Sequence, residues 1–214
     1  MNVTVIDYGV GNLRSLRRGL ERAGADVRVS DDPDAIRDAE ALVLPGVGAF
    51  QECVNNSEPF HDVLVEKAAD TPILGVCVGL QLMYEESTEG APEGETVEGL
   101  GLIPGRVERL PDSVKVPHMG WNELVPERDH PIMDGIEAGD YAYFVHSYCA
   151  DVTDRTIASC EYGRRFAAVA ANEAGNVIGT QFHPEKSGET GLKVLSNFVE
   201  YAEAYHAGEV AAAE

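Results

Sequence analysis

The chain has 214 residues, of which 16 are Lys or Arg and 37 are Asp or Glu, so its formal net charge is −21. A hydrophobic fraction of 44% and recurrent apolar runs exclude a disordered chain, and the acidic balance argues against partners such as nucleic acids or anionic membranes, which need a basic face. The length fits one α/β domain over residues 1–214, with a frayed tail over residues 207–214.

The first half of the chain alternates strand-like and helix-like segments. The expected strands are Asn2–Asp7, Asp26–Ser30, Ala41–Pro45 and Thr71–Val76, and the expected helices are Gly11–Gly24, Asp34–Asp38, Pro59–Ala69 and Cys77–Glu86. In the first of these helices Leu13, Leu16 and Leu20 share one face, and Gly24 ends the apolar pattern. Such alternation predicts a mostly parallel central sheet flanked by helices.

The second half of the chain has a different pattern. Glu89–Glu98 is acidic and Gly-rich, which indicates a loop. Short strands are expected at Gly105–Leu110, Ala142–Tyr148, Thr156–Glu161, Phe166–Asn172 and Val177–Phe182, and a closing helix at Gly188–His206. The last two strands form a predicted hairpin that turns at Glu173–Asn176. The predicted fold class is therefore α/β, with an antiparallel extension of the parallel sheet in the second half.

The cysteines and the apolar runs set expectations for metal binding and location. Cys53, Cys77, Cys149 and Cys160 lie far apart, with no Cys-x-x-Cys or Cys/His ligand spacing, so we expect no metal site. No apolar run approaches the roughly 18 residues that a membrane span needs, and the N-terminus lacks a basic segment of the signal-peptide kind. These features predict a soluble cytoplasmic protein with reduced thiols.

The basic residues are divided unevenly between the two types, since Arg occurs 12 times and Lys only 4 times. A large acidic excess with few Lys indicates adaptation to a salt-rich cytoplasm, where salt screens the repulsion between like charges. The alternative is an ordinary acidic protein with a charge-rich surface.

The sharpest local motif is GVCVG, Gly75–Gly79, in which an apolar strand runs directly into a helix. This is the pattern of a nucleophile elbow with Cys77 in place of serine. At the helix N-terminus a thiolate is favoured, and the Val78 N–H points at any oxyanion formed beside the sulfur. A small buried cysteine in a tight turn is the alternative.

A nucleophilic cysteine needs a base and a group that orients the base. In FHPE, Phe182–Glu185, the side chains of His183 and Glu185 project to the same side if the segment is extended, and Pro184 stiffens that shape. Without the elbow, this motif would be an ordinary surface loop.

Two Gly-rich turns follow strands. PGVG, Pro45–Gly48, can expose backbone N–H groups to a ligand at the carboxyl end of the sheet, although a plain connecting turn has the same composition. GVGN, Gly9–Asn12, lacks the remaining glycines and lysine of a phosphate loop, so tight strand–helix packing explains it better. His118 and His146 lie in apolar contexts, where a structural role is the default.

Together these motifs resemble the class I, triad-type glutamine amidotransferases, and among them the glutaminase subunits of imidazole glycerol phosphate synthases of histidine biosynthesis. The resemblance covers almost the whole chain. It is carried by the stretches DYGVGNLRSL, LPGVGAF, GVCVGLQLMYEESTEG, GLGLIPGRVERL, VPHMGWNEL, YFVHSY and FHPEKSGETGLKVLSNF. The chain departs only mildly from the family pattern, at Val78, where leucine is common. Only the backbone N–H of this residue is required there.

The resemblance implies a role for each matching residue. Cys77 is the nucleophile, His183 the general base and acid, and Glu185 the orienting carboxylate. Val78 and the Val47–Gly48 peptide match the oxyanion hole, for which the family is thought to need a peptide flip. The residues implied in holding glutamine are Gln81, Ser147 and Tyr148, and those implied in the subunit interface are Trp121, Asn122, Tyr143 and Lys186.

The resemblance also implies a reaction and a partner. Cys77 attacks the glutamine carboxamide, a thioester forms, and glutamate and ammonia are released without a metal or an organic cofactor. Ammonia then crosses into a separate (β/α)8-barrel cyclase subunit of the heterodimer, which makes imidazole glycerol phosphate and an aminoimidazole carboxamide ribotide. The alternatives are a triad amidotransferase of another biosynthetic synthase, a Cys hydrolase of similar fold, or a non-catalytic α/β binding module.

Overall fold

The computed structural model describes residues 1–210, and its largest element is an eight-stranded sheet in the order β2-β1-β3-β4-β14-β13-β12-β9. The strands from β2 to β14 run parallel, and those from β14 to β9 are antiparallel. Their bounds are β2 (Asp26–Ser30), β1 (Asn2–Ile6), β3 (Ala41–Leu44), β4 (Ile73–Val76), β14 (Val177–Thr180), β13 (Arg165–Ala171), β12 (Thr156–Glu161) and β9 (Val125–Pro126). The predicted α/β class with an antiparallel extension is confirmed.

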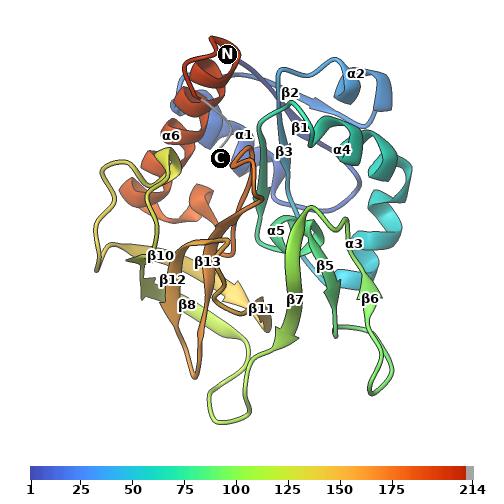
Figure 1. The fold of residues 1–214 in the computed structure, drawn as a ribbon, viewed down its shortest axis with the longest axis vertical. Helices are drawn as coiled ribbons and strands as arrows, with labels where there is room; N and C mark the ends of the chain where they lie inside the picture. The colour runs from blue at the N-terminus through green and yellow to red at the C-terminus, as the bar shows by residue number, and fades with distance from the viewer. Residues whose placement is uncertain (211–214) are drawn as a thin grey trace.

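Helices cover both faces of the parallel part of the sheet, as Figure 1 shows, with α1 and α6 on one side and α2, α3 and α4 on the other. The helices are α1 (Leu13–Arg22), α2 (Pro33–Arg37), α3 (Phe50–Ser57), α4 (His61–Lys67), α5 (Val78–Met83) and α6 (Gly188–His206). Every residue of β3 and β4 is buried, as expected for central parallel strands covered on both faces. Leu16 and Leu20 bury the apolar face of α1.

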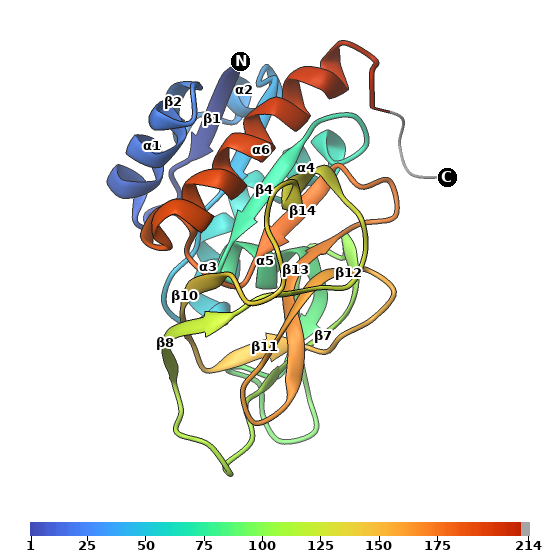
Figure 2. The same cartoon turned by 90° about the vertical axis from the view of Figure 1, so that its left-hand side faces the viewer.

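Two smaller sheets form the opposite end of the molecule (Figures 1 and 2). One has the order β11-β7-β5-β6, and the other pairs β8 with β10. Their strands are β5 (Tyr84–Ser87), β6 (Val97–Glu98), β7 (Ile103–Arg109), β8 (His118–Glu123), β10 (Tyr141–His146) and β11 (Tyr148–Ala150). Three 3-10 helices complete the described elements: η1 (Glu58–Phe60), η2 (Pro131–Met133) and η3 (Pro184–Lys186).

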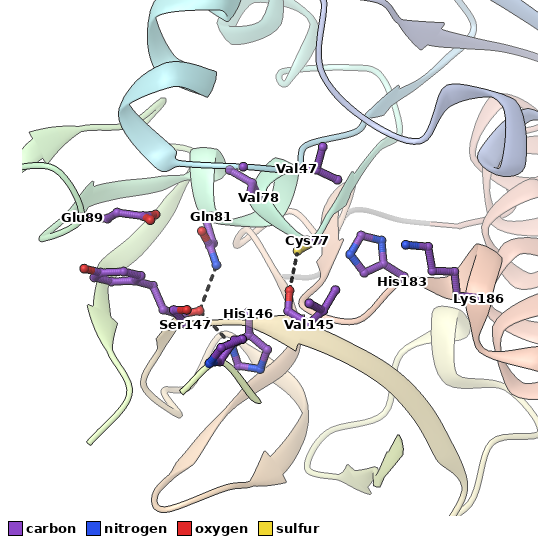
Figure 3. A pocket seen from close by; sticks show the side chains of 13 residues that line it. Val47, Cys77, Val78, Gln81, Glu89, Val145, His146, Ser147, His183 and Lys186 are labelled. Carbon is purple, nitrogen blue, oxygen red and sulfur yellow. Dashed lines mark hydrogen bonds between the residues drawn. The ribbon is translucent and has the colours of Figure 1, made fainter. Parts of the chain in front are cut away.

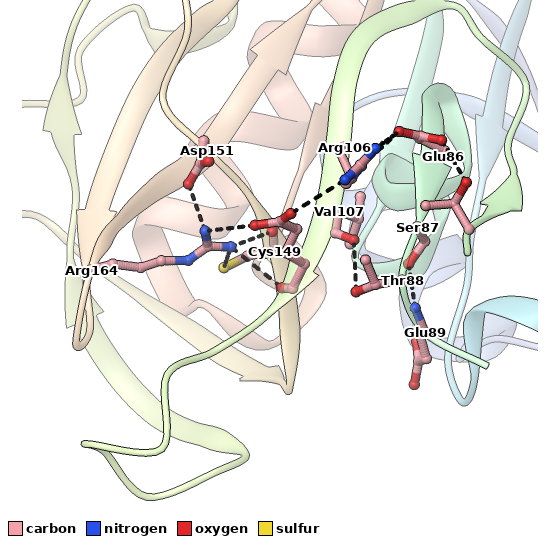
Figure 4. A network of polar contacts seen from close by, with 11 residues as sticks. Glu86, Ser87, Thr88, Glu89, Arg106, Val107, Cys149, Asp151 and Arg164 are labelled. Atoms are coloured by element: carbon pink, nitrogen blue, oxygen red, sulfur yellow. Dashed lines mark hydrogen bonds and ion pairs between the residues drawn. The ribbon is translucent and has the colours of Figure 1, made fainter. Parts of the chain in front are cut away.

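Arg164, in the turn between β12 and β13, ties the large sheet to the four-stranded one (Figure 4). Its Nη2 donates to the carbonyl oxygen of Cys149 at 2.7 Å and to that of Glu108 at 3.3 Å. Its Nη1 pairs with Asp151 at 2.6 Å. Because one guanidinium bridges β7 and β11, it sets the place of the strand that begins at Tyr148.

Several predicted boundaries are wrong for reasons that lie outside the local sequence. The helix expected over Cys77–Glu86 ends at Met83, because the backbone of Leu82 and Tyr84 accepts hydrogen bonds from Leu100 and Gly101 and passes into β5. Helix α3 was not predicted. The N–H of its first residue, Phe50, donates at 3.0 Å to the carboxylate of Glu89, a cap that lies 39 residues away.

Other elements differ less. The hairpin turning at Glu173–Asn176 is confirmed by the antiparallel pairing of β13 with β14. Strand β8 and the short strands β6 and β9 were not predicted, and the strand expected over Ala142–Tyr148 divides into β10 and β11. Helix α6 ends at His206, as predicted, and Ala207, Gly208 and Glu209 still donate backbone hydrogen bonds to its last turn. The rest of the tail expected to fray, 211–214, lies outside the described residues.

Within residues 1–210, no helix combines the length and apolarity needed to cross a membrane.

Candidate active site

A cavity of about 410 Å³ opens where β3 and β4 end, between the parallel sheet and the two smaller sheets (Figure 3). This volume lies within the range of roughly 300–1,000 Å³ that is usual for small-ligand sites. The cavity is lined by Val47, Gly48, Cys77, Val78, Gln81, Glu89, Pro117, Val145, His146, Ser147, Tyr148, His183 and Lys186. The structure thus brings all the predicted triad, oxyanion-hole and substrate residues to one cavity, except Glu185, which lies behind His183.

Cys77 stands at the turn between β4 and α5 with φ +55° and ψ −109°, and it is the one non-glycine residue with positive φ in the described part of the chain. The flanking glycines are required by close packing. A Cβ on Gly79 would lie 1.9 Å from the carbonyl oxygen of Leu44, and one on Gly75 would lie 2.8 Å from that of Gly79. The geometry is that of the predicted elbow, with a strained backbone that presents the sulfur to the cavity.

The imidazole of His183 is held by Glu185, with 3.0 Å between Nδ1 and Oε1. Both side chains are only 2% exposed, and the second carboxylate oxygen, Oε2, has no hydrogen-bond partner among the described residues. The predicted extended shape of this segment is wrong, because Pro184–Lys186 form the 3-10 helix η3. The two side chains meet because this turn curls Glu185 back beneath the imidazole.

The charge on His183 is set by two opposing influences. Burial disfavours the imidazolium, but hydrogen bonds and charge interactions with Cys77 and Glu185 outweigh it and raise the pKa of His183 to about 9. At neutral pH the ring is therefore a cation beside the sulfur, which stabilises a thiolate. The sulfur also lies 3.8 Å from the carbonyl oxygen of Val145 and 3.8 Å from Nε2 of Gln181.

The expected oxyanion hole is occupied by the protein's own backbone. The N–H of Val78 donates to the carbonyl oxygen of Gly46 at 3.3 Å, so it does not face the space beside the sulfur as predicted. Gly46 fits there because a Cβ would come within 2.5 Å of the backbone nitrogen of Gly79. Val47 and Gly48, the other expected contributors, are exposed at the mouth of the cavity.

Gln81 and Tyr148 are joined across the cavity. Nε2 of Gln81 donates to the carbonyl oxygen of Tyr148 at 2.9 Å and to Oε1 of Gln181 at 3.1 Å. The amide nitrogen of Gln81 is thus committed to protein acceptors, and its oxygen is the atom available to a ligand. Ser147, the residue before Tyr148 in the chain, also lines the cavity.

Glu89 is a cavity residue that the sequence analysis missed, having assigned it to a loop. Burial is the main cause that raises the pKa of its carboxyl group, and the hydrogen bond from the Phe50 N–H opposes that rise. It is the one Asp or Glu among the lining residues. The sequence did contain a signal for Glu89, which lies in the YEESTEG stretch that follows the helix carrying Cys77. This stretch must turn back past that helix, and the return brings Glu89 to the cavity.

His118 and His146 form a buried hydrogen-bonded pair. Nδ1 of His118 lies 3.0 Å from Nε2 of His146, and Nδ1 of His146 lies 2.9 Å from the carbonyl oxygen of Tyr148. Since that carbonyl can only accept, His146 carries its proton on Nδ1 and accepts from Nδ1 of His118. Burial lowers the pKa of His118 to about 4 and that of His146 to about 3, so both rings are neutral at neutral pH. The expected structural role of both rings agrees with this geometry, although His146 also reaches the cavity wall.

Three of the residues expected at an interface lie on an outward surface, and one points inward. The outer face of the β8/β10 sheet carries Met119, Trp121 and Tyr141, which are 64%, 54% and 49% exposed, and the rings of Trp121 and Tyr143 pack edge-to-face with centroids 5.9 Å apart. Lys186 is exposed at the cavity mouth. The amide of Asn122 turns to the other side of β8, lying 3.3 Å from Nε2 of His118 and donating to the carbonyl oxygen of Glu161 at 3.0 Å.

Comparison with known proteins shows which families this chain resembles. A family model described as glutamine amidotransferase class-I matches residues 4–202. Two relatives named imidazole glycerol phosphate synthase subunit HisH come from the halophilic archaea Halobacterium salinarum and Natronomonas pharaonis. The first is 55% identical over 94% of this chain and 93% of its own length, and the second is 56% identical over 93% and 94%. A chain in the structure of PurLQS from Thermotoga maritima has the same fold, with a TM-score of 0.71 at 22% identity over 94% of this chain and 98% of that one.

Proposed function

Because the chain belongs to the class I glutamine amidotransferases and, within them, to the HisH subunits of imidazole glycerol phosphate synthase, we propose that it releases ammonia from glutamine for a cyclase subunit. The observation that carries this proposal is that Cys77 and His183 line one cavity, with Glu185 hydrogen-bonded to His183 from behind. The names of the relatives favour this function over a triad amidotransferase of another synthase, a Cys hydrolase or a binding module.

The reaction begins with attack of the Cys77 thiolate on the γ-carboxamide carbon of glutamine. The imidazolium of His183 then gives its proton to the departing nitrogen, so that ammonia leaves and a γ-glutamyl thioester remains. Neutral His183 next takes a proton from water, and the hydroxide attacks the thioester to give glutamate and regenerate the thiolate. Each proton that His183 donates is recovered in the second step, so the cycle closes without a cofactor.

Glu185 acts through His183. With Oε1 on Nδ1, the carboxylate holds the ring so that Nε2 faces the sulfur and the leaving nitrogen. It also stabilises the positive charge that the ring carries between proton transfers, in agreement with the raised pKa of His183.

The oxyanion hole requires a change of backbone conformation. When the Gly46–Val47 peptide turns over, the carbonyl oxygen of Gly46 leaves the Val78 N–H, and the Val47 N–H takes its place beside the sulfur. The turning unit is thus the Gly46–Val47 peptide, one residue before the Val47–Gly48 peptide that the sequence analysis assigned. Two backbone donors are then available, and removal of one such donor in a comparable site costs roughly 2.7–4 kcal/mol of transition-state stabilisation.

The rest of the cavity holds the amino-acid end of glutamine. Glu89, a half-buried carboxylate at the end of the cavity away from His183, pairs with the α-ammonium group (Figure 3). Ser147 and Tyr148 hold the α-carboxylate and the chain of the substrate on the facing wall, and Oε1 of Gln81 accepts from substrate N–H groups. This arrangement places the carboxamide beside Cys77.

The cyclase subunit docks on the outer face of the β8/β10 sheet. Trp121 and Tyr143 supply an aromatic anchor at its centre, and Lys186 lies where the cavity opens toward that face. Asn122 supports the face from beneath through His118. Ammonia that leaves Cys77 on this side enters the partner before it meets bulk solvent and becomes ammonium.

The protein works in the cytoplasm. The four cysteines are unpaired and buried, which suits a reducing compartment, and the acidic surface agrees with relatives from halophilic archaea.

The test measures glutamate release from glutamine by the purified chain, alone and with its cyclase subunit and that subunit's ligand. We expect low activity alone, a marked rise with the partner, and no activity in Cys77→Ala under either condition. Strong activity on peptides or esters without a partner would contradict the proposal.

A further inference from the structure

The Pro45–Gly48 loop, which passes over the elbow, is held by three separate hydrogen bonds to three successive carbonyl oxygens. The hydroxyl of Tyr8 donates to the carbonyl of Pro45, the Val78 N–H donates to that of Gly46, and the thiol of Cys53 donates to that of Val47 at 3.4 Å. The donors come from the segment after β1, from the start of α5 and from α3. Only the middle bond involves the peptide that must turn over to open the oxyanion hole.

Tyr8 and Cys53 differ from ordinary surface donors because both are buried, Tyr8 being 6% exposed and Cys53 fully inaccessible. The two side chains also lie next to each other, so that each contributes to the environment of the other. Burial, helped by the neighbouring thiol, raises the pKa of Tyr8 well above its usual value, and burial raises the pKa of Cys53 to about 11. Both groups therefore keep their protons at neutral pH and remain donors to the loop.

A peptide plane turns about the line joining its two Cα atoms, so its neighbours need not move if their carbonyls are anchored. In this loop the Pro45 and Val47 carbonyls are the anchored neighbours, and the Gly46–Val47 peptide is the plane between them. Gly46 has no Cβ to resist the change in its own dihedral angles. The bonds from Tyr8 and Cys53 can persist in both orientations, whereas the bond from Val78 must break.

We propose that Tyr8 and Cys53 are positioning residues that act as paired pivots for the Gly46–Val47 peptide, confining the change of the loop to that peptide and aiming the Val47 N–H at the oxyanion. This inference rests on the proposed glutaminase reaction, and it names the residues that fix the position of the Val47 N–H in the oxyanion hole of that reaction. Neither residue touches the substrate, because neither lines the cavity.

The consequence for catalysis is a separation of kcat from KM. Substrate is held by other walls of the cavity, so loss of a pivot leaves KM within about twofold. The oxyanion forms only in the transition state, so a misplaced Val47 N–H lowers kcat, by about tenfold for each pivot removed.

The experiment compares Tyr8→Phe, Cys53→Ala and Cys53→Ser in complex with the cyclase subunit, with glutamine turnover as the readout. We expect Tyr8→Phe and Cys53→Ala to lose kcat at nearly constant KM, and Cys53→Ser, which retains a donor, to recover most of it. Alkylation of Cys77 by iodoacetamide, followed by peptide mass spectrometry, is a second readout. It needs a thiolate but no oxyanion hole, so its rate in the variants should stay within twofold of the unmodified chain.

The outcomes separate this proposal from the proposed function. Unchanged kcat in Cys53→Ala would overturn the pivots, as would a parallel loss of kcat and Cys77 alkylation, which indicates general disruption of the elbow. Thermal unfolding of each variant shows whether it folds, and if Tyr8→Phe does not, the Cys53→Ala and Cys53→Ser pair decides. Absence of glutamine turnover in the unmodified complex would instead overturn the glutaminase assignment itself.

Discussion

The imidazole of His183 and the carboxylate of Glu185 lie 3.0 Å apart in a pocket where each side chain is only 2% exposed. They are two residues apart in sequence and meet through a 3-10 turn rather than along an extended segment. This pair sets the charge and the direction of the ring that faces Cys77, and the first two predictions concern it.

Glu185→Gln should retain the shape of the turn while removing the charge that orients His183. The amide can hold the ring in the wrong tautomer, so we expect kcat for glutamine hydrolysis to fall by roughly 10³–10⁴-fold. Glu200→Gln, which alters an exposed carboxylate on α6, is the matched control and should retain full activity. A loss of less than tenfold in Glu185→Gln would remove this carboxylate from the mechanism.

The alkaline limb of kcat/KM should lie near pH 9. The pKa of His183 is raised to about 9, so the imidazolium that protonates ammonia is present below that pH and is lost above it. The same shift, from an unfolded value of 6.5, stabilises the fold fully below about pH 6.5 and ceases to do so as the pH rises through 9. A pH–rate profile of the free subunit checks this, and a limb near pH 6.5 would contradict it.

The buried pair of His118 and His146 should make the fold sensitive to mild acid. The folded pKa of His118, about 4, lies below the model-peptide value of 6.5, so the unfolded chain binds a proton first and stability falls as the pH drops from 6.5 toward 4. His118→Phe retains stacking against Phe144 and Tyr162 but removes the titration. Denaturant unfolding at a series of pH values should therefore show a shallower loss in the variant than in the parent. Equal slopes would mean that His118 titrates normally.

Trp121→Ala should weaken binding of the cyclase subunit by at least about tenfold, because exposed aromatic anchors dominate interface energies. Val65→Ala truncates an exposed apolar side chain on α4, well away from the β8/β10 sheet, and should leave the affinity unchanged. Isothermal titration measures both, and saturating partner should restore stimulated turnover in Trp121→Ala. If both variants bind equally well, the partner docks elsewhere.

Salt should stabilise this chain more than it stabilises a neutral protein. A net charge of −21 creates repulsion that salt screens, with a Debye length of about 10 Å at 0.1 M and about 3 Å at 1 M. We expect the melting temperature to rise steadily with KCl from 0.1 M to 2 M, as measured by calorimetry. A flat profile would favour the reading of an ordinary acidic protein.

Motif spacing predicted more of the site than of the secondary structure. The elbow glycines and Cys77 could be identified because the strand-to-helix turn leaves few residue choices, and the structure shows the clash that a Cβ on Gly79 would cause. His183 was then identified from the FHPE motif, because a nucleophilic cysteine needs a base. Helix α3 could not be predicted, because the cap on Phe50 comes from Glu89. Asn122 was predicted at the interface with its neighbour Trp121, but alternation along β8 sends the two side chains to opposite faces.

By itself, the sequence determined the parallel sheet with its antiparallel extension and the strongly acidic surface, which depend on local periodicity and on composition. Its resemblance to a known family pointed to Cys77, His183 and Glu185 as the triad proposed here. Only the tertiary structure decided that Gly46 covers the Val78 N–H, that Glu89 enters the cavity, and that Tyr8 and Cys53 hold the loop above the elbow. Each of these is a contact between segments far apart in the chain, and such contacts exist only once packing of the core has brought those segments together.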